Sequence, residues 1–83
     1  MRELSLDHLR TLVAIADLGS LANAARALHL AAPTVTVQIA ELESRLGGQL
    51  LVRGRGPAQA TALGEQFIVR ARRLLADADD AVE

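Results

Sequence analysis

The 83-residue sequence has no cysteine, tryptophan or tyrosine, and its only aromatic residue is Phe67. Without cysteine, neither a disulfide nor a thiolate metal site can support so short a chain. Two widely separated histidines do not make a ligand set either, so we expect no metal and no cofactor. No apolar run approaches the roughly 20 residues that span a bilayer, and the residues after Met1 lack a signal-peptide core. These absences predict a soluble, cytoplasmic protein.

The sequence also lacks the motifs that would indicate an enzyme. There is no nucleophile elbow, no glycine loop that would cradle a phosphate, and no carboxylate pair in a plausible cleft. Gly54 and Gly56 flank an arginine in a turn and do not form a dinucleotide-binding fingerprint. We therefore expect no catalysis.

What the chain does contain favours a small helical domain. Hydrophobic residues make up 51% of it, mostly alanine and leucine, which suits packed helices. The net charge of −1 hides an asymmetry. All nine basic residues are arginines, and they precede a tail in which Asp77, Asp79, Asp80 and Glu83 are acidic. The first 76 residues are therefore positive overall, which favours steering toward a polyanion.

Cap residues divide the chain into four amphipathic helices. Ser5 and Ser20 are good N-caps, Gly19 and Gly47-Gly48 are helix stops, and Pro33 suits the first position of a helix. Thr61 caps a last helix that extends to the end of the chain. The expected helices cover about residues 5–18, 20–28, 33–46 and 62–83.

A short β-hairpin is expected between the last two helices. Residues 49–53 are mainly apolar, residues 54–57 (GRGP) have turn chemistry, and residues 58–60 could return as a partner strand. Two short helices joined by a tight turn, then a third and a hairpin, predict a mainly α winged helix-turn-helix. The expected division is this domain at residues 1–60 and a linker or dimerisation helix at residues 61–83.

The helix expected at residues 33–46 has two contrasting sides. Val35, Ile39, Leu42 and Leu46 form a core stripe. The opposite side carries small, uncharged side chains, among them Thr36, Val37 and Ala40.

The last helix carries an apolar stripe longer than a small domain can cover. Its length of roughly 30 Å would leave distal apolar residues exposed in a monomer, and a partner helix would cover them. We therefore expect a homodimer formed through this helix. Some residues of the stripe are expected to lie in the core of the domain itself. The predicted interface residues are Phe67, Ala71, Leu74, Leu75, Ala78 and Val82.

The segment LRTLVAIADLGSLANAARALHLAAPTVTVQIAELESRLGGQLLVR, followed by ATALGE, resembles the N-terminal domain of LysR-type transcriptional regulators over nearly the whole chain. The resemblance implies a DNA-binding dimer whose long linker helix pairs antiparallel with its twin. It also implies a larger C-terminal domain that senses a small-molecule co-inducer. The sequence lacks that domain, which indicates a piece of a longer regulator or a natural stand-alone form.

The sequence departs from the family pattern at the start of the third helix. The family usually has Ser or Thr, then Gln, then Pro, where this chain has Ala31-Ala32-Pro33. Loss of the hydroxyl removes a helix cap worth about 1 kcal/mol, and loss of the amide removes a group able to pair with adenine. Thr36 replaces the usual Ser, and Val37 stands at a position that is frequently basic. We therefore expect Thr36, Val37 and Ala40 to contact thymine methyl groups, with DNA shape adding to specificity.

The predicted partner is double-stranded DNA at an operator with an inverted repeat, with the helix at about residues 33–46 in the major groove. The hairpin at 49–60 would serve as the wing, its arginines on phosphates or in the minor groove. The predicted contact residues are Ala32, Pro33, Thr34, Thr36, Val37, Gln38, Arg53 and Arg55.

The other polar residues are not expected to be central to DNA recognition. We expect Glu43 to be structural, as a partner of an arginine or a capping group, and His8 and His29 to be structural or exposed. Glu41 opposes phosphate affinity, and only a cytosine contact would explain it.

One alternative function stays open at this point. A winged helix that had lost base recognition could act as an interaction module that pairs with another regulator through its long helix. Ala31, Ala32, Val37, Glu41 and the acidic tail favour this alternative, whereas the nine arginines oppose it.

Overall fold

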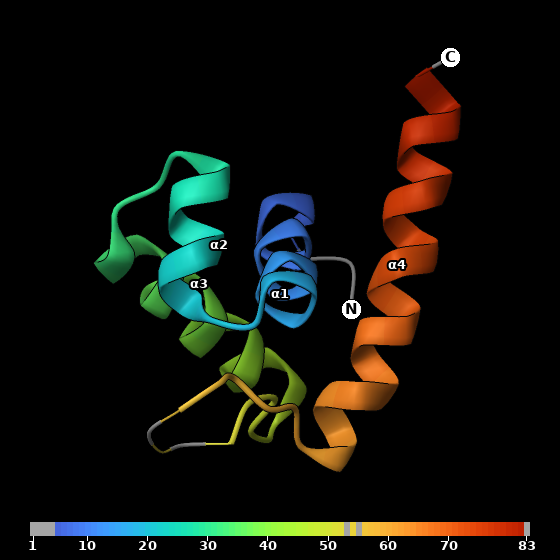
Figure 1. Cartoon of the computed structure of the whole chain (residues 1–83). Coiled ribbons are helices and arrows are strands. Elements are labelled where there is room, and N and C mark those ends of the chain that lie inside the picture. The colour runs from blue at the N-terminus through green and yellow to red at the C-terminus, as the bar shows by residue number, and fades with distance from the viewer. Residues whose placement is uncertain (1–4, 53, 55, 83) are drawn as a thin grey trace.

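The structure of the chain, a computed structural model, describes residues 5–52, 54 and 56–82, with side chains up to Asp79. The described part is mainly α and contains four helices: α1 (Leu6–Leu18), α2 (Leu21–Leu28), α3 (Ala32–Leu46) and α4 (Ala62–Val82) (Figure 1). The first three form a compact unit, and α4 extends along one side of it. The predicted fold class is confirmed.

Local capping chemistry explains most of the helix ends. The hydroxyl oxygens of Ser5 and Ser20 accept hydrogen bonds from the backbone N–H groups of Asp7 (3.2 Å) and Asn23 (3.0 Å). Gly19 and Gly47 end α1 and α3 in the left-handed conformation, with φ of 85° and 77°. These ends match the predicted ones because caps are set by residues adjacent in sequence.

The start of α3 differs from the prediction by one residue. The N–H groups of Thr34 and Val35 both donate to the carbonyl of Ala31, so helical hydrogen bonding begins one residue earlier than expected and Pro33 is the second residue of the helix. Proline costs no hydrogen bond there, because the first N–H groups of a helix have no partner within it. Ala31 provides no side-chain cap.

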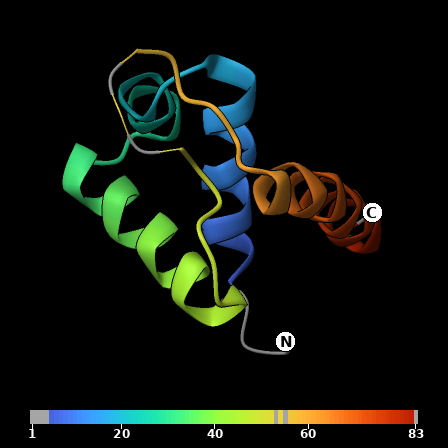
Figure 2. The ribbon, with the colours of Figure 1, turned by 90° about the horizontal axis from the view of Figure 1, so that it is seen from below.

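Helix α1 is the centre of the molecule. It packs against α2, α3 and α4, while α4 contacts no other helix within the described residues. Figure 2 shows α1 between α4 on one side and α2 and α3 on the other. The core is a single cluster that includes Leu9, Leu12, Ile15, Val35, Leu42, Leu50, Phe67 and Ala71. The position of α4 relative to α3 is therefore determined by α1 and by the loop between α3 and α4.

The hairpin predicted at 49–60 is reduced to one antiparallel bridge, between Leu51 and Ala60, in the part of the chain that the structure describes. Val52 N–H donates to Gln59 O (2.8 Å), and Thr61 N–H donates to Leu50 O (3.0 Å). The short hairpin predicted from the sequence is therefore present, with a single antiparallel pair. Pro57 has no N–H to donate, and Ala58 N–H donates to Gly19 O (2.8 Å) rather than across the loop. We call residues 49–60 the wing.

The first turn of α4 lies directly on the wing. Thr61 caps the helix by accepting from Gly64 N–H (2.9 Å) and donates to the carbonyl of Gln49. Gly64 is buried, and a Cβ there would lie 2.0 Å from the carbonyl oxygen of Leu50. Glycine is therefore required for this close approach of α4 to the wing.

Candidate nucleic-acid interface

The outer face of α3, formed by Pro33, Thr36, Val37 and Ala40, points away from the core. All four residues are exposed, and Val37 keeps 55% of its surface. Thr36 donates its hydroxyl proton to Ala32 O (3.3 Å), which leaves the hydroxyl oxygen as an acceptor. The face thus offers methyl groups and one hydroxyl.

The first turn of α3 extends this exposed surface. Ala32 and Thr34 are both exposed, beside the outer face. No side chain caps the helix at Ala31. Pro33 has no N–H and the Thr34 N–H donates to Ala31 O (3.0 Å), so the Ala32 N–H is the first-turn group that is open to an external acceptor. This N–H group, together with the helix dipole, favours an anion.

Gln38 lies at the α1 side of α3 rather than on the outer face. It is half-buried, and its Oε1 accepts a hydrogen bond from the hydroxyl of Thr11, which is only 1% exposed. The Thr11 hydroxyl also lies 3.0 Å from Asp7 O. The side-chain oxygen of Gln38 therefore joins α3 to α1. The predicted DNA contact of Gln38 would be made by its side-chain amide nitrogen, and it stays a prediction.

Glu41 also faces α1, where its Oε1 lies 3.5 Å from His8 Nε2. The contact with His8 gives Glu41 a role within the fold, whereas the sequence alone suggested only a cytosine contact for it. His8 is half-buried, and His29, exposed in the left-handed conformation with φ 59°, ends α2. The structural roles expected of the histidines agree with this placement. The partner of Glu41 was not predictable, because it lies on a different helix.

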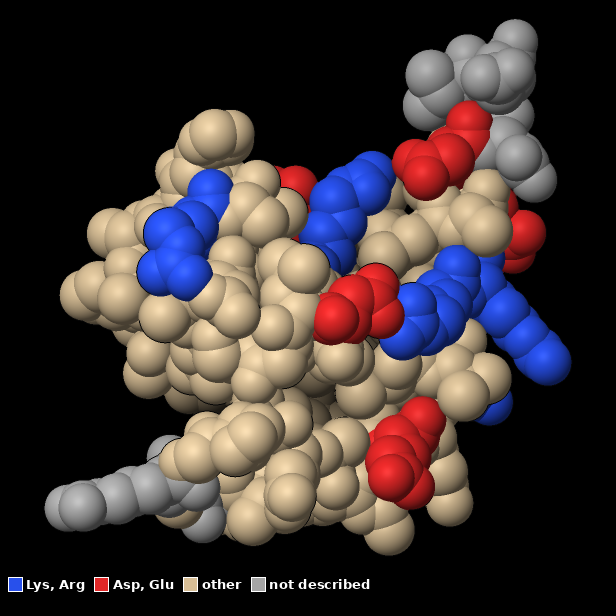
Figure 3. Space-filling view, in the orientation of Figure 1, with Lys and Arg blue, Asp and Glu red and all other residues tan. Residues whose placement is uncertain are grey.

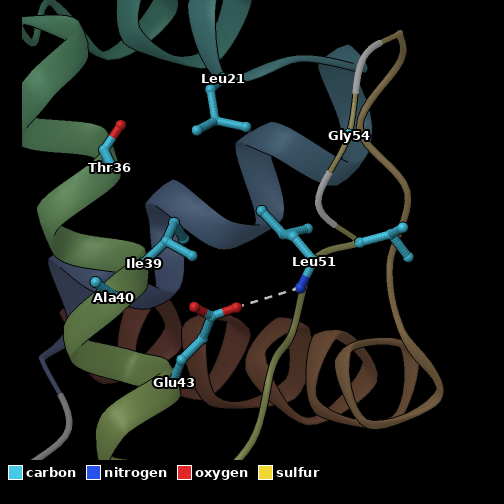
Figure 4. A pocket seen from close by; sticks show the side chains of 8 residues that line it. Leu21, Thr36, Ile39, Ala40, Glu43, Leu51 and Gly54 are labelled. Carbon is cyan, nitrogen blue, oxygen red and sulfur yellow. Dashed lines mark hydrogen bonds between the residues drawn. The ribbon is translucent and has the colours of Figure 1, made fainter.

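On its other side, α3 is joined to the wing through Glu43. Its Oε2 accepts from Leu50 N–H (2.8 Å) and lies 3.4 Å from Leu51 N, and Figure 4 shows the carboxylate directed at the wing backbone. A groove of about 260 Å³ lies here between α3 and the wing, lined in part by Thr36, Leu51 and Val52. Glu43 therefore has the capping role expected of it. Arg53 and Arg55, the predicted wing contacts, lie outside the described residues.

Charge is unevenly distributed over the molecule. In the view of Figure 3, blue and red side chains gather over α1 and α4, while the side formed by α2 and its neighbouring loops shows a blue patch on an otherwise uncharged surface. The outer face of α3 has no charged side chain among the residues described there. Direct recognition by this face must therefore depend on methyl and hydroxyl groups.

The residues predicted for a dimer interface have different environments in α4. Phe67 and Ala71 are buried in the core of the domain itself, which leaves them little surface for a partner. Leu74 is 44% exposed and borders a shallow groove with Arg70 and Arg73. Leu75 and Ala78 are half-buried. Val82 lies in α4, but its side chain is outside the described part.

The described residues contain neither a membrane-spanning helix nor a metal-binding cluster. No helix among them is long and apolar enough to cross a membrane. No group of three His, Asp or Glu side chains in the same residues could hold a metal ion.

Residues 6–65 match a known family, described as bacterial regulatory helix-turn-helix protein, lysR family. The match covers more than half of the chain and includes α1, α2, α3, the wing and the start of α4. The chain belongs to the lysR family. This confirms the resemblance seen in the sequence, and DNA binding by a transcriptional regulator is the function that such membership supports.

Curated lysR-family relatives resemble the chain over most of its length. It is 48% identical over 80 residues to the small neutral protease regulatory protein of Streptomyces coelicolor, which covers 96% of this chain. It is 43% identical over 74 residues to the HTH-type transcriptional regulator YdcI of Escherichia coli, which covers 89% of it. The chain spans about a quarter of the length of these curated relatives, because the matches cover 24% of each.

Solved structures of lysR-family domains share the fold. The BenM DNA-binding domain in complex with catB site 1 DNA superposes with a TM-score of 0.90 at 41% identity, covering 94% of this chain and 87% of that one. The CbnR DNA-binding domain in complex with DNA gives 0.89 at 36% identity, covering 93% and 88%. The fold of this chain is therefore that of the winged helix-turn-helix DNA-binding domains of the family.

Proposed function

We propose that this chain is the sequence-specific double-stranded DNA-binding domain of a cytoplasmic, nucleoid-associated regulator, with no catalytic step of its own. The observation that carries the proposal is the exposed outer face of α3, held at a fixed angle by α1 on one side and by the wing on the other. The major groove of B-DNA is wide enough for one α-helix. In helix-turn-helix proteins, the helix in the position of α3 enters that groove while the preceding helix crosses the backbone.

The chemistry of the outer face points to thymine as a recognised base. Thymine is the only ordinary base that presents a methyl group in the major groove. Val37 and Ala40 provide apolar surface for such a group, and the Thr36 oxygen can accept a hydrogen bond from an amino group of adenine or cytosine. Recognition by methyl contacts is weaker than bidentate pairing, so DNA shape would provide part of the specificity.

The phosphate contacts in this proposal come from both ends of the surface. At the start of α3, the Ala32 N–H and the exposed hydroxyl of Thr34, beside Pro33, suit a phosphate oxygen. At the other end, Arg53 and Arg55 of the wing would contact phosphates or the minor groove, as the family pattern implies. These contacts would position the domain without selecting a sequence.

The proposal includes a homodimer formed through α4. Leu74, together with Leu75, Ala78 and Val82 farther along the helix, would contact a second copy and cover apolar surface that a monomer leaves to water. A twofold dimer presents two copies of α3 and therefore prefers an inverted repeat. The rest of a full-length relative would hold the domain that binds a small-molecule co-inducer.

The test is a selection from random duplexes, followed by fluorescence anisotropy with the selected duplex at several salt concentrations. We expect an inverted repeat that contains thymine, bound well above the unselected pool. Log affinity should fall with log salt by about 0.9 for each phosphate contacted.

Uracil in place of thymine removes only the methyl group and so tests the outer face directly. Within the half-site it should weaken binding several-fold, and the same change outside the half-site serves as the matched control. Loss that is equal at both places would refute methyl recognition. If a folded, dimeric sample enriches no sequence, the interaction module becomes the better account of the chain.

A further inference from the structure

Two ion pairs connect α1 and α4 in a regular arrangement. Arg10 Nη2 lies 3.6 Å from Asp79 Oδ1, and Arg72 Nη2 lies 2.7 Å from Asp17 Oδ1. The α1 members are seven positions apart, and so are the α4 members. Seven residues are close to two helical turns, so each helix presents its two charges on one face. In Figure 3, blue and red side chains meet along the seam between the two helices.

The pair of Asp17 and Arg72 is the better formed of the two. Besides the 2.7 Å contact, Arg72 Nη1 lies 3.4 Å from Asp17 Oδ2, so both carboxylate oxygens face the guanidinium. This hydrogen bond holds the pKa of Asp17 below its usual value, and the same contact raises the pKa of Arg72. About half of each of these two side chains remains exposed.

The order of the charges selects one register of the helices. Each pair has an arginine and an aspartate, but the arginine is on α1 in one pair and on α4 in the other. Sliding α4 by two turns in one direction would place Arg72 opposite Arg10, and Glu65 opposite Asp17. Sliding it by two turns in the other direction would place Asp79 opposite Asp17. Each slip brings like charges together, which is unfavourable.

Apolar packing alone would not define this register as strictly. The buried α4 residues of the core, Phe67, Ile68 and Ala71, all lie in the first half of the helix, and Leu75 beyond them is only partly buried against the core. Hydrophobic burial is not directional. Beyond them the Arg10 and Asp79 pair joins the second half of α4 to α1. Because α4 contacts no helix other than α1 in the described part, these ion pairs act directly on its orientation.

We propose that Arg10, Asp17, Arg72 and Asp79 are positioning residues that fix the direction of α4 and thereby set the half-site spacing the dimer prefers. The proposal rests on the proposed DNA-binding dimer. A tilt of about 10° displaces the far end of a roughly 30 Å helix by about 5 Å. That exceeds the rise of about 3.4 Å between successive base pairs. Small changes at the seam would therefore change the distance between the two copies of α3 by a base pair or more.

The first experiment measures the direction of α4 without DNA. The chain has no cysteine, so nitroxide labels can be attached to cysteines introduced at the exposed positions Ala27 of α2 and Ala76 of α4. Double electron–electron resonance, on labelled protein diluted with unlabelled protein, then gives the distance distribution within one chain. We expect a narrow distribution that Asp17→Arg broadens or shifts.

Two variants control this measurement. The double exchange Asp17→Arg with Arg72→Asp restores a pair of opposite charges, keeps the net charge and should restore the narrow distribution. Arg73→Asp makes the same change of charge as Arg72→Asp at the next position, on a different face of α4, and should leave the distribution unchanged. Circular dichroism confirms that each variant is folded.

The second experiment uses duplexes with two selected half-sites at several separations, and a duplex with one half-site. The measured quantity is the ratio of the affinities for the best and the next-best half-site separation. Asp17→Arg should lower this ratio by roughly threefold or more, or shift the preferred separation. Its affinity for the single half-site should stay unchanged, and the double exchange should restore the original preference. Loss of single-site affinity would indicate a merely structural effect and overturn the proposal.

The outcomes separate this proposal from the proposed function. An unchanged distance distribution in Asp17→Arg overturns the positioning role, whatever the DNA results. A broadened distribution with an unchanged spacing preference overturns the link to spacing. If the unmodified protein selects no DNA, the proposed function fails and the spacing claim fails with it. The resonance experiment still decides whether the ion pairs fix the direction of α4.

Discussion

Gly64 lies where the first turn of α4 crosses the backbone of Leu50. A Cβ at this position would lie 2.0 Å from the carbonyl oxygen and 2.9 Å from the carbonyl carbon of Leu50. Because both atoms belong to the backbone, relief requires movement of the wing or of α4. We expect Gly64→Ala to lower the free energy of unfolding by about 1–3 kcal/mol, measured by urea denaturation.

Gly48→Ala is the matched control for this substitution. A Cβ at Gly48 would also be close to another atom, but that atom is Cδ2 at the end of the Leu63 side chain, 2.8 Å away. Since a leucine side chain can rotate, we expect a much smaller loss. Equal losses from the two substitutions would contradict the account of Gly64.

Ala31 has the extended backbone of a helix N-cap, with φ −72° and ψ 146°, but no side chain that can cap α3. A serine would accept a hydrogen bond from an N–H group of the first turn. We expect Ala31→Ser to raise the free energy of unfolding by about 1 kcal/mol, measured in the same assay. Ala27→Ser, at an exposed position within α2, should instead be neutral or slightly destabilising. A loss of stability from Ala31→Ser would refute the capping argument.

At single residues, the sequence predicted what depends on near neighbours. The caps at Ser5, Gly19 and Ser20 were predicted correctly, since each acts within a few residues of its own position. The contact of Gln38 with Thr11 was not predicted. It crosses from α3 to α1, and helical periodicity does not define how two helices are rotated against each other.

At the scale of elements, the contact of α1 with α4 through Asp17 has a pH dependence of defined sign. The hydrogen bond from Arg72 lowers the pKa of Asp17 in the folded protein, whereas the unfolded value is about 4. The stability from this pair is therefore fully present above the unfolded pKa, and it is lost as the pH falls through the lower folded pKa. Because both side chains are exposed, the contribution is small.

We expect the difference in unfolding free energy between the unmodified protein and Asp17→Asn to be constant from about pH 7 to pH 5 and to shrink below about pH 4. Urea denaturation over this range measures it. In an Arg72→Gln background, the same substitution should have no such dependence. A difference that grows toward low pH would contradict the assignment.

The elements themselves were predictable to different degrees. The four helices follow from 3.6-residue periodicity and caps, so their ranges were nearly correct. The short hairpin of the wing was also predicted, and it has one antiparallel bridge in the described residues. The sequence did not indicate that other backbone groups of the wing bond outside the loop: Ala58 N–H to Gly19 O, and Leu50 N–H to Glu43. Such contacts depend on the packed arrangement, which short-range patterns do not describe.

At the scale of the whole molecule, the exposed apolar side chains of α4 test the proposed dimer. Leu74 and Val69 are both exposed, at 44% and 54%, but they lie on different faces of the helix. We expect Leu74→Glu to raise the dimer dissociation constant by about tenfold or more, measured by sedimentation equilibrium. Val69→Glu is the matched control and should have little effect. Equal weakening by both would place the interface elsewhere.

The arrangement of α4 against α1 was the least predictable feature of the fold. The apolar stripe in the sequence correctly indicated that α4 packs against something, but it did not separate core residues from dimer residues. Phe67 and Ala71, which were named for the interface, lie in the core of the domain itself. The ion pairs join residues more than fifty positions apart. Their partners could not be identified from the charge pattern of either helix alone.

The isolation of α4 from α2 and α3 among the described residues has a consequence for how such regulators diversify. Substitutions on the outer face of α3 would change which bases are favoured, and substitutions along the α1–α4 seam would change how far apart the two sites lie. The two sets consist of different residues, so selection can act on each separately. New operators could thus be acquired by descendants of one ancestral domain in small, independently inherited steps.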